Sequence, residues 1–331
     1  MAYVYYTLGL GLTLFIIVDL IWTTLWLGGG AGPLSDRLTT LTWKVIKRID
    51  NKYLSNLTGP LILSLTILSW FLLMWLGVTL FFAGHPDAIF NPETGVAITW
   101  SERFYFTGFT LFTLGLGDYS PQPGFFQVAT AVTSGTGMLL LTFGASYIIS
   151  IVSAVVEKRS FARNVTGVGL TSAEFIKTAW NGRDFFQIDL TLAQLNSQIT
   201  KLTQQNQAFP LLQYYHSEND EKSSVVAISV LDEALTFLHY GLKDKGKVNT
   251  TLLKATRSSI ENYLNTIIDG YGNQTKEINE FPKKMDLSAL DETAIPMTSQ
   301  KEYNEKLAKI STRRNQLLSI VRVDNHQWPN E

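Results

Sequence analysis

The sequence predicts an all-α membrane protein that also carries a helical cytoplasmic domain. Three apolar stretches, residues 4–27, 61–83 and 125–156, reach the length of about 20 residues that a helix needs to cross a bilayer. Charge is uneven, because residues 1–156 hold 13 of the 55 Lys, Arg, Asp and Glu side chains. Residues 160–331 have apolar side chains at helical spacing and few alternating β-branched runs, which predicts a helical domain in water.

The first apolar stretch, residues 4–27, is predicted to be a retained membrane helix rather than a signal peptide. It has no basic segment before the apolar run, it is too long, and it lacks a small-residue cleavage motif. The third stretch, residues 125–156, is longer than one crossing requires. Its excess is predicted to continue as helix into water or to tilt in the membrane.

Basic residues predict the topology, because they concentrate on the cytoplasmic side of a membrane. Residues 28–60 hold five of them and residues 84–124 hold only Arg103, while Lys158, Arg159 and Arg163 follow the third stretch. We therefore expect residues 28–60 and the C-terminal domain in the cytoplasm, with the N-terminus and residues 84–124 outside. A cell (inner) membrane of a bacterium is compatible with this multi-pass arrangement.

A linker helix is predicted after the first span. Apolar residues recur every three or four positions there, as on one helix face, with the basic residues mostly off it: Leu34, Leu38, Leu41, Val45, Ile49 and Tyr53. The sequence leaves two alternatives open, a helix on the anionic inner leaflet or a linker packed on its neighbours.

The region after the second span contains an apolar segment that is too short to cross the membrane. Residues 101–112, SERFYFTGFTLF, have the length of a re-entrant helix. Ser101 is the predicted N-cap, and Glu102 lies in the first turn, where the helix dipole favours a carboxylate. The next residues, TLGLGDYSP, return as extended chain. Such backbone is tolerated at membrane depth only where it is buried in protein or lines a water-filled cavity.

Alternating glycines give this extended stretch a chemical role. Successive carbonyls can all point at one axis only if alternate residues adopt backbone angles that side chains disfavour, and Gly115 and Gly117 supply that freedom. Four such chains around an axis make rings of carbonyl oxygens that can replace the water shell of a cation, and Thr113 can add hydroxyls at the inner end. The same TLGLG at residues 7–11 lies inside a spanning helix, where small residues serve helix packing.

The stretch from Thr113 to Pro121 resembles the potassium-channel signature Thr-Val-Gly-Tyr-Gly-Asp, followed two residues later by Pro. It is especially similar to the second pore loop of some two-pore-domain potassium channels, where Leu also replaces Tyr. The resemblance covers residues 61–156 and implies a two-transmembrane pore module: outer helix, pore helix, filter and inner helix. It implies K⁺ at the filter carbonyls of Thr113, Leu114, Gly115 and Leu116, with Gly117 and Asp118 at the outer mouth.

The resemblance also implies a gating hinge in the third span. Gly137 follows Asp118 by nineteen residues and matches the inner-helix hinge of the family, and Gly135 is a second candidate. Helix–helix packing is the alternative for either glycine. The rest of the helix would line the inner cavity or gate through Leu141, Ala145 and Ile148.

Two departures from the family pattern predict a more plastic filter with weaker discrimination of potassium from sodium. Leu116 lacks the hydroxyl through which the filter Tyr usually bonds to the pore helix, and Tyr105, Phe106 and Phe109 are left as an apolar cuff. Phe109 also occupies the position where some members place a carboxylate that pairs with the filter Asp. Asp118 is therefore predicted to be freer.

One chain carries one pore loop, so a closed ring of four carbonyl donors requires a homotetramer. We expect a homotetrameric potassium-selective channel embedded in lipid, and not an enzyme. The alternatives are a weakly selective cation channel of the same fold and a non-conducting membrane signalling or scaffold protein with a pore-like region. No span carries arginines at every third residue, which argues against a voltage sensor.

Composition excludes other kinds of site. The chain has no cysteine, which excludes thiolate metal sites, iron–sulfur clusters and a cysteine nucleophile. Its four histidines are not at metal-ligand spacing, and its net charge of −1 gives no reason to expect nucleic acid. No cofactor is expected beyond K⁺ ions in the filter.

Asp19 lies within the first span, where a carboxylate is a functional hypothesis by default. Pairing with a neighbouring helix, or reaching the interface, is the preferred interpretation because the residue lies towards the cytoplasmic end of the span.

We expect three domains: residues 1–58 with the first span and the linker helix, residues 59–158 with the pore, and residues 159–331 as the cytoplasmic domain. Gly167 and Gly169 are not followed by the third glycine of a dinucleotide fingerprint, so the usual nucleotide-binding domain is not expected. An unknown ligand or protein on residues 159–331 would regulate the channel.

Overall fold

A computed structural model describes residues 2–26, 30–49, 52–93, 95, 98–271 and 280–329, and of residues 52–55 and 271 it gives the backbone alone. The fold is all-α, as predicted, and the described residues contain one sheet of two short strands. The chain divides into two compact units. Unit 1 comprises Met1–Asn51 and Pro60–Ile151, and unit 2 comprises Lys52–Gly59 and Val152–Glu331. The division into three domains stays a prediction.

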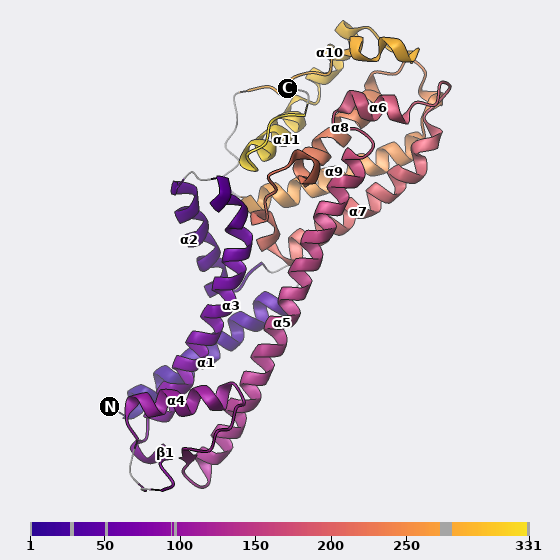
Figure 1. Cartoon of the computed structure of the whole chain (residues 1–331). Coiled ribbons are helices and arrows are strands. Elements are labelled where there is room, and N and C mark those ends of the chain that lie inside the picture. Colours follow the sequence, from indigo (N-terminus) through magenta and orange to yellow (C-terminus); the bar gives the residue numbers. More distant parts are fainter. Residues whose placement is uncertain are drawn as a thin grey trace. The chain divides into compact units, whose positions relative to one another are not determined.

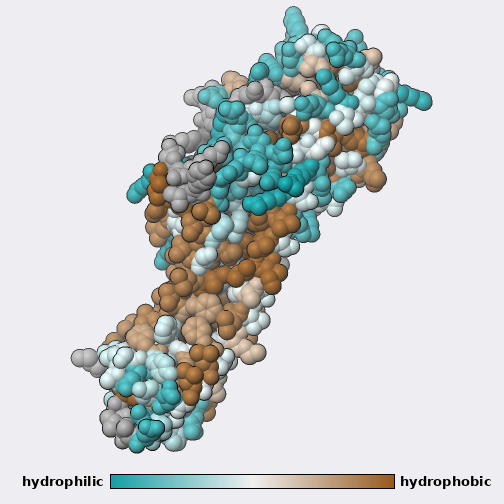
Figure 2. Space-filling view, viewed as in Figure 1, coloured by the Kyte–Doolittle hydropathy of each residue, from teal (hydrophilic) through white to brown (hydrophobic). Residues whose placement is uncertain are grey.

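Three helices in the described residues are long and apolar enough to cross a membrane: α1 (Ala2–Leu25), α3 (Lys52–Ala83) and α5 (Phe125–Thr166) (Figure 1). α3 and α5 contain the second and third predicted stretches, and α1 contains the first as far as Leu25; Trp26 follows the helix and Leu27 lies outside the described residues. The excess of the third stretch continues as helix to Thr166, as predicted. Figure 2 shows hydrophobic residues gathered on the visible face of the spanning helices, while hydrophilic residues dominate the visible face of unit 2.

The linker helix is α2 (Pro33–Ile49), and it packs through a different face from the predicted one. Its buried residues are Ser35, Trp43 and Ile46, whereas Leu41 and Val45 of the predicted stripe are more than half exposed. The face of Trp43 packs because α2 is fixed at its N-terminus to α1, and this orientation turns the predicted stripe outward. The inner-leaflet alternative stays a prediction for that stripe, and the side chain of Tyr53 lies outside the described residues.

Between the second and third spans lie η1 (Pro86–Ala88), β1 (Ile89–Phe90), α4 (Trp100–Leu111) and β2 (Ser120–Pro121). β1 pairs antiparallel with β2, with Ile89 opposite Pro121. This pairing joins the chain before α4 to the chain after the TLGLG stretch. An apolar cluster that includes Phe82, Phe106 and Phe126 packs α4 between the ends of α3 and α5.

Unit 2 is built from six further α-helices in the described residues, with short 3₁₀ helices between them. The α-helices are α6 (Ser172–Ala179), α7 (Asp189–Ala208), α8 (Ser224–Tyr240), α9 (Thr250–Tyr271), α10 (Gln300–Ala308) and α11 (Ser311–Val323). The 3₁₀ helices are η2 (Phe186–Ile188), η3 (Pro210–Tyr214), η4 (Asp220–Lys222), η5 (Lys245–Lys247) and η7 (Leu287–Thr293). Helix α7 packs along α9, and the two run side by side in Figure 1.

Helix α8 forms the centre of unit 2, since every residue from Ser224 to Leu238 is buried. Two carboxylates in it, Asp232 and Glu233, are fully buried and are paired with α11. Arg313 Nη2 lies 2.6 Å from Asp232 Oδ1, and Arg314 Nε lies 2.6 Å from Glu233 Oε1. Charges are tolerated in such a core only when they are paired, so these bonds tie α11 to one register on α8.

Candidate functional site

The candidate site begins with the N-terminus of α4, whose N-cap is Thr99 rather than the predicted Ser101. The Thr99 side chain accepts from the Glu102 N–H at 3.4 Å, and Glu102 Oε2 accepts from the Thr99 N–H at 2.6 Å. This is a capping box, and the sequence Thr-Trp-Ser-Glu carries its signal. Ser101 was the wrong choice because only a residue three positions before Glu102 can exchange both bonds with it.

Glu102 also receives a bond from beyond the filter. The Tyr119 hydroxyl donates to Glu102 Oε1 at 2.9 Å. Three hydrogen bonds hold the pKa of the Glu102 carboxyl below its ordinary value. In order of effect, they come from the Thr99 side chain, the Thr99 backbone and the Tyr119 side chain. The carboxylate therefore stays ionised at the positive end of the α4 dipole, and it links the start of α4 to Tyr119, two residues after TLGLG.

Side-chain hydrogen bonds fix α4 against the outer helix α3. Thr79 and Thr107 share a hydrogen bond of 2.7 Å between their hydroxyls, and both side chains are fully buried. Trp75 Nε1 donates to the Phe104 carbonyl at 3.0 Å. The rings of Trp75 pack so closely on Gly108 that a Cβ there would come within 3.1 Å of the indole. These contacts hold the pore helix rigidly at one depth along α3.

The backbone after α4 alternates in handedness. Thr113, Gly115 and Gly117 have φ of 59°, 57° and 87°, while Leu114 and Leu116 between them do not have positive φ. The alternation that the two glycines predict is therefore present, and it starts two residues earlier, at Thr113. Positive φ at a threonine is strained by about 1–3 kcal/mol, and such strain collects at functional sites.

Two backbone hydrogen bonds carry the chain from helix to filter. The Thr113 N–H donates to the Thr110 carbonyl at 3.1 Å, and the Leu114 N–H donates to the Phe109 carbonyl at 2.8 Å. Every residue from Phe112 to Asp118 is exposed in the single chain. These residues are thus accessible to groups outside the chain.

Asp118 is not free, which corrects the prediction made from Phe109. The hydroxyl of Tyr105, one turn before Phe109, donates to Asp118 Oδ2 at 2.6 Å. Tyr105 therefore does not belong to a purely apolar cuff, because its hydroxyl reaches the residue that follows TLGLG. Only Phe106 and Phe109 of the three are buried, in the cluster that packs α4. The sequence spacing did not reveal this pair because the two residues meet only once the filter folds back along α4.

The two glycines of the third span differ in their surroundings. A Cβ at Gly137 would lie 1.7 Å from the carbonyl oxygen of Leu111, at the end of α4. A Cβ at Gly135 would meet nothing within 4 Å among the described residues. Gly137 therefore permits close contact of α5 with α4. Leu141, Ala145 and Ile148, the predicted lining residues, are exposed in the single chain.

Asp19 pairs with neighbouring helices, as preferred from the sequence. It is fully buried, and its carboxylate accepts from the Leu34 N–H at 2.7 Å, the Ser35 hydroxyl at 2.6 Å and Trp70 Nε1 at 2.8 Å. The carboxylate thus caps the N-terminus of α2 and holds it to α1 and α3. Trp70 in turn packs on Tyr147 of α5, with ring centroids 5.9 Å apart.

Sequence reasoning missed the residues that hold the pore helix and the filter mouth. Thr99, Tyr105 and Tyr119 bond across the loop, and Trp75 and Thr79 bond across helices. Of these, only Thr99 has a local sequence signal. Within the described residues, no group of three or more His, Asp or Glu side chains could hold a metal ion.

Comparisons with known proteins agree with this geometry. A family model described as "Ion channel" matches residues 65–154, which include α4, the TLGLG stretch and most of the two helices around them. The chain is also similar to the uncharacterized membrane protein YdjJ of Bacillus subtilis (strain 168). The two are 38% identical over 315 residues, which cover 95% of this chain and 92% of that protein. No solved structure matches the chain significantly.

Proposed function

The chain belongs to the pore-loop family of ion channels, and on that premise we propose that it forms a homotetrameric, potassium-selective channel. The observation that carries the proposal is the alternation of positive φ at Thr113, Gly115 and Gly117. Such a backbone can turn successive carbonyls towards one axis, where they replace the water shell of a dehydrated cation.

One chain supplies only part of the carbonyl ring, which supports the proposed homotetramer. Leu114 and Leu116 are more than half exposed, and one chain supplies one set of carbonyls. The first half of α5 also presents an uncovered apolar face through Val128, Val132 and Met138. Four copies around one axis would close the carbonyl rings and cover part of that face.

In this proposal K⁺ binds the carbonyls of Thr113, Leu114, Gly115 and Leu116, and leaves past Gly117 and Asp118. The hydrogen bond from Tyr105 holds the Asp118 carboxylate at the mouth. Adjacent ions repel one another, which keeps each site weak enough for ions to leave. The transported ion is the substrate, and the chain contributes the preformed oxygen ligands.

Gating is proposed at the inner helix α5. Gly137 is held against the Leu111 carbonyl, whereas the position of Gly135 is open among the described residues. This difference favours Gly135 as the place where α5 bends and Gly137 as the point where it is anchored. The C-terminal half of the chain would regulate that bend from the cytoplasm.

The topology proposed from the basic residues is unchanged: the N-terminus and the pore mouth lie outside, and α2 and unit 2 lie in the cytoplasm. Cysteines introduced at exposed positions would test this, because the native chain has none. Labelling of intact cells by an impermeant maleimide is expected at Glu93 replaced by Cys and not at Arg183 replaced by Cys. The reverse pattern would invert the topology.

Reversal potentials test the function. The purified full chain would be placed in a planar bilayer with potassium on one side and sodium on the other. A reversal near the potassium equilibrium potential is expected. A reversal near zero with unitary currents would move the function to weakly selective conduction, which Leu116 in the filter favours as the second candidate. A stable tetramer without current under any tested ligand would support the signalling alternative.

A further inference from the structure

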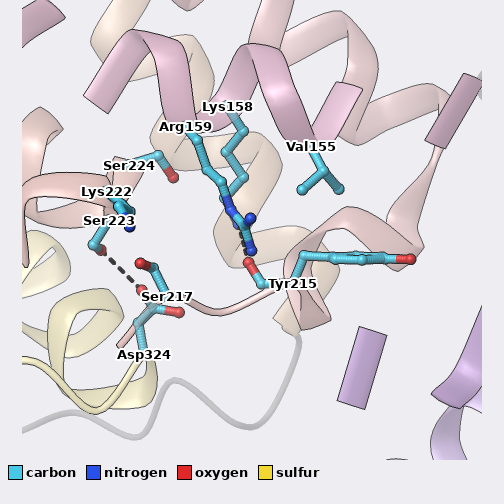
Figure 3. Close-up of a pocket in the computed structure, with 9 residues that line it drawn as sticks. All are labelled: Val155, Lys158, Arg159, Tyr215, Ser217, Lys222, Ser223, Ser224 and Asp324. Carbon is cyan, nitrogen blue, oxygen red and sulfur yellow. Dashed lines mark hydrogen bonds between the residues drawn. The ribbon is translucent and has the colours of Figure 1, made fainter. Parts of the chain in front are cut away.

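Two of the pockets that the described residues of unit 2 form differ in what they can hold. The first lies beside the last turns of α5 and is drawn in Figure 3; its room of about 10 Å³ is enough for one water. Lys158 Nζ in this pocket donates to the Leu212 and Tyr215 carbonyls, each at 3.1 Å. The Ser223 hydroxyl donates to Asp324 at 3.0 Å, as the dashed line in Figure 3 shows. This pocket therefore has neither the space nor the free donors for a larger ligand.

The second pocket lies where the chain leaves α8, at the opposite end of that helix from Ser223. It measures about 540 Å³, within the range of roughly 300–1,000 Å³ for sites that hold small molecules. Three segments line it, namely the chain after α8, the chain around η7 and the chain that leads into α10. Its polar lining includes Lys243, Asp286, Asp291, Thr298, Ser299 and Gln300.

Hydrogen bonds fix the walls of this second pocket. An isolated antiparallel bridge joins the chain after α8 to the chain before α10. Beside it, the Lys243 N–H donates to the Pro296 carbonyl at 3.0 Å, and the Thr298 N–H donates to the Gly241 carbonyl at 2.8 Å. The Gln300 side chain joins α10 to η7, because its Oε1 accepts from the first N–H of η7 at 2.8 Å. The pocket is thus formed before any ligand arrives.

Thr298 in the wall of this pocket has a polar group without a partner. The residue is more than nine-tenths buried, and its hydroxyl makes no hydrogen bond among the residues that the structure describes. A buried polar group without a partner destabilises a folded protein, and native structures contain few of them. Rotation about the Cα–Cβ bond can turn this hydroxyl towards the pocket without breaking a hydrogen bond. A ligand would supply the missing partner.

The charged side chains of the pocket leave one cation and one anion for a ligand. Asp286 is engaged, since its Oδ1 accepts from the Ser288 N–H at 3.0 Å at the start of η7. Lys243 and Asp291 are exposed, and their side chains have no hydrogen bond or ion pair with any residue that the structure describes. A ligand with one charge would satisfy only one of these two groups. A ligand that carries both charges satisfies both.

The first turn of α10 adds donors for a carboxylate. Ser299 caps this helix, and its hydroxyl oxygen accepts from the Glu302 N–H at 3.3 Å. The preceding N–H groups, of Gln300 and Lys301, have no acceptor within the helix, and the positive end of the helix dipole lies there. The Glu302 carboxylate does not compete for them, because it is paired with Lys306 at 2.7 Å. The anionic end of a ligand is therefore favoured at this turn.

We propose that this pocket binds a free amino acid with an apolar side chain. The carboxylate of the ligand lies at the first turn of α10, with Lys243 and the Thr298 hydroxyl as further donors, and its ammonium group pairs with Asp291. An amino acid carries both charges and an apolar group in a molecule that the volume admits. The apolar lining offers surface to the ligand side chain and consists of Leu287, Ile295, Pro296 and Met297.

Binding at this site stands apart from the channel function, whereas an effect on conduction rests on the proposed function. The pocket adjoins the C-terminal end of α8, the buried centre of unit 2. The other end of α8 lines the pocket of Figure 3 together with the last turns of α5, the proposed gating helix. An amino acid changes the gating equilibrium only by the difference in its affinity for the two states.

The test measures binding to the full chain in neutral detergent by calorimetry. The probes are L-leucine, L-methionine and two fragments of leucine: 4-methylpentanoate, which lacks the ammonium group, and 3-methylbutylamine, which lacks the carboxylate. The variants K243Q and D291N each remove one charge of the pocket. The matched controls are K245Q and E292Q, at exposed neighbours that do not line it.

The variant T298V tests the unpartnered hydroxyl separately from stability. Because this hydroxyl has no partner in the free protein, a methyl group in its place is expected to leave the thermal unfolding midpoint unchanged or to raise it. The same variant is expected to weaken the binding of L-leucine about tenfold. A lowered midpoint with unchanged binding would show that the hydroxyl serves the fold and not the ligand.

Binding of L-leucine or L-methionine that weakens at least about tenfold in K243Q and in D291N, and not in the controls, is expected. Both fragments are expected to bind more weakly than leucine. Failure of both amino acids to bind the wild type would overturn the site, as would an equal loss in the controls or equal binding of a fragment and leucine. Current in the bilayer assay is scored separately: binding without current keeps the site and refutes the channel, and current without binding does the reverse.

Discussion

At the scale of single residues, hydrogen bonds that the sequence did not predict hold the region of TLGLG that is the proposed filter. Tyr105 bonds to Asp118 and Tyr119 bonds to Glu102, so both bonds tie the residues directly after TLGLG to the first half of α4. In the family pattern, a Tyr hydroxyl at position 116 forms the hydrogen bond to the pore helix. Here Tyr105 and Tyr119 form hydrogen bonds between α4 and the residues after TLGLG instead. The outer mouth is braced, whereas Leu116 itself is half exposed and makes no polar bond through its side chain.

Replacing Leu116 by Tyr is expected to increase the preference for potassium over sodium. A phenol at this position can hydrogen-bond to the pore helix and stiffen the middle of the filter, which the bonds of Tyr105 and Tyr119 do not reach. The measurement is the shift of reversal potential between potassium and sodium solutions. Leu116→Ile is the control because it restores no hydroxyl. Equal selectivity of wild type and Leu116→Tyr would refute the proposed plasticity.

Replacing Gly137 by Ala is expected to disrupt the pore, while Gly135→Ala is expected to be tolerated. The new methyl group at 137 would lie 1.7 Å from the Leu111 carbonyl oxygen, so α5 would have to move away from α4. Overpacking of this kind costs typically about 1–3 kcal/mol. Thermal unfolding and tetramer content in detergent measure the effect. Equal behaviour of the two variants would contradict the packing role of Gly137.

At the scale of elements, helix ends decide how unit 1 is assembled. The pore helix α4 starts in a capping box and ends against Gly137, so both of its ends are fixed. The linker helix α2 starts at the carboxylate of Asp19, which belongs to α1 and accepts from the Leu34 N–H. Because α2 is anchored there, the face that carries Trp43 is buried, and the stripe that dominates the sequence pattern is left exposed.

Asp19→Ala is expected to loosen α2 and to lower the stability of unit 1. The substitution leaves the Trp70 indole N–H and the Ser35 hydroxyl without their acceptor, and a buried unpaired polar group costs about 1–3 kcal/mol. Asp19→Asn keeps one acceptor oxygen and should lose less. Thermal unfolding in detergent measures the order wild type, Asn, Ala. The control is Asp36→Asn, at an exposed carboxylate in the first turn of α2; a similar loss there would contradict a special role for Asp19.

At the scale of the whole molecule, polar bonds inside a buried core connect distant parts of unit 2. Asp324 lies after α11, yet it bonds to His216 and to Ser223 at the start of α8. Burial by itself raises the pKa of Asp324, but the hydrogen bond from His216 and the charges of His216, Lys158 and His326 together bring it below the ordinary value. The ionised carboxylate therefore stabilises the folded state.

This lowered pKa predicts how the stability of unit 2 changes in acid. Because the folded state holds the proton less tightly than the unfolded state, the contribution is complete above an ordinary Asp pKa of about 3.9 and is lost as the pH falls through the native value. The difference in unfolding midpoint between wild type and Asp324→Asn is expected to be large at about pH 6 and small at about pH 3. Fluorescence of the buried Trp328 can report it. A difference that persists at low pH would show that Asp324 acts through shape alone; Asp291→Asn is the exposed control.

The sequence by itself determined the membrane-spanning helices, the short helix α4 and the left-handed backbone at Gly115 and Gly117. Each of these follows from local physics: apolar length for a crossing, a length too short for one, and glycines where backbone angles must be left-handed. The helical character of unit 2 was also predictable from spacing. Its pairing of Asp232 and Glu233 with two arginines was not, because the partners lie 81 residues apart.

Only the tertiary structure decided which residues hold those elements in place. The N-cap at Thr99 had a local signal. The hydrogen bonds of Tyr105 to Asp118 and of Trp70 to Asp19, and the close approach of Gly137 to the Leu111 carbonyl, join segments that the sequence keeps apart. Each depends on a distance and an orientation that exist only after the helices pack. Hydrophobic patterns specify which elements form, whereas hydrogen bonds and close contacts select one arrangement, because their energy is lost over a displacement of about 1 Å.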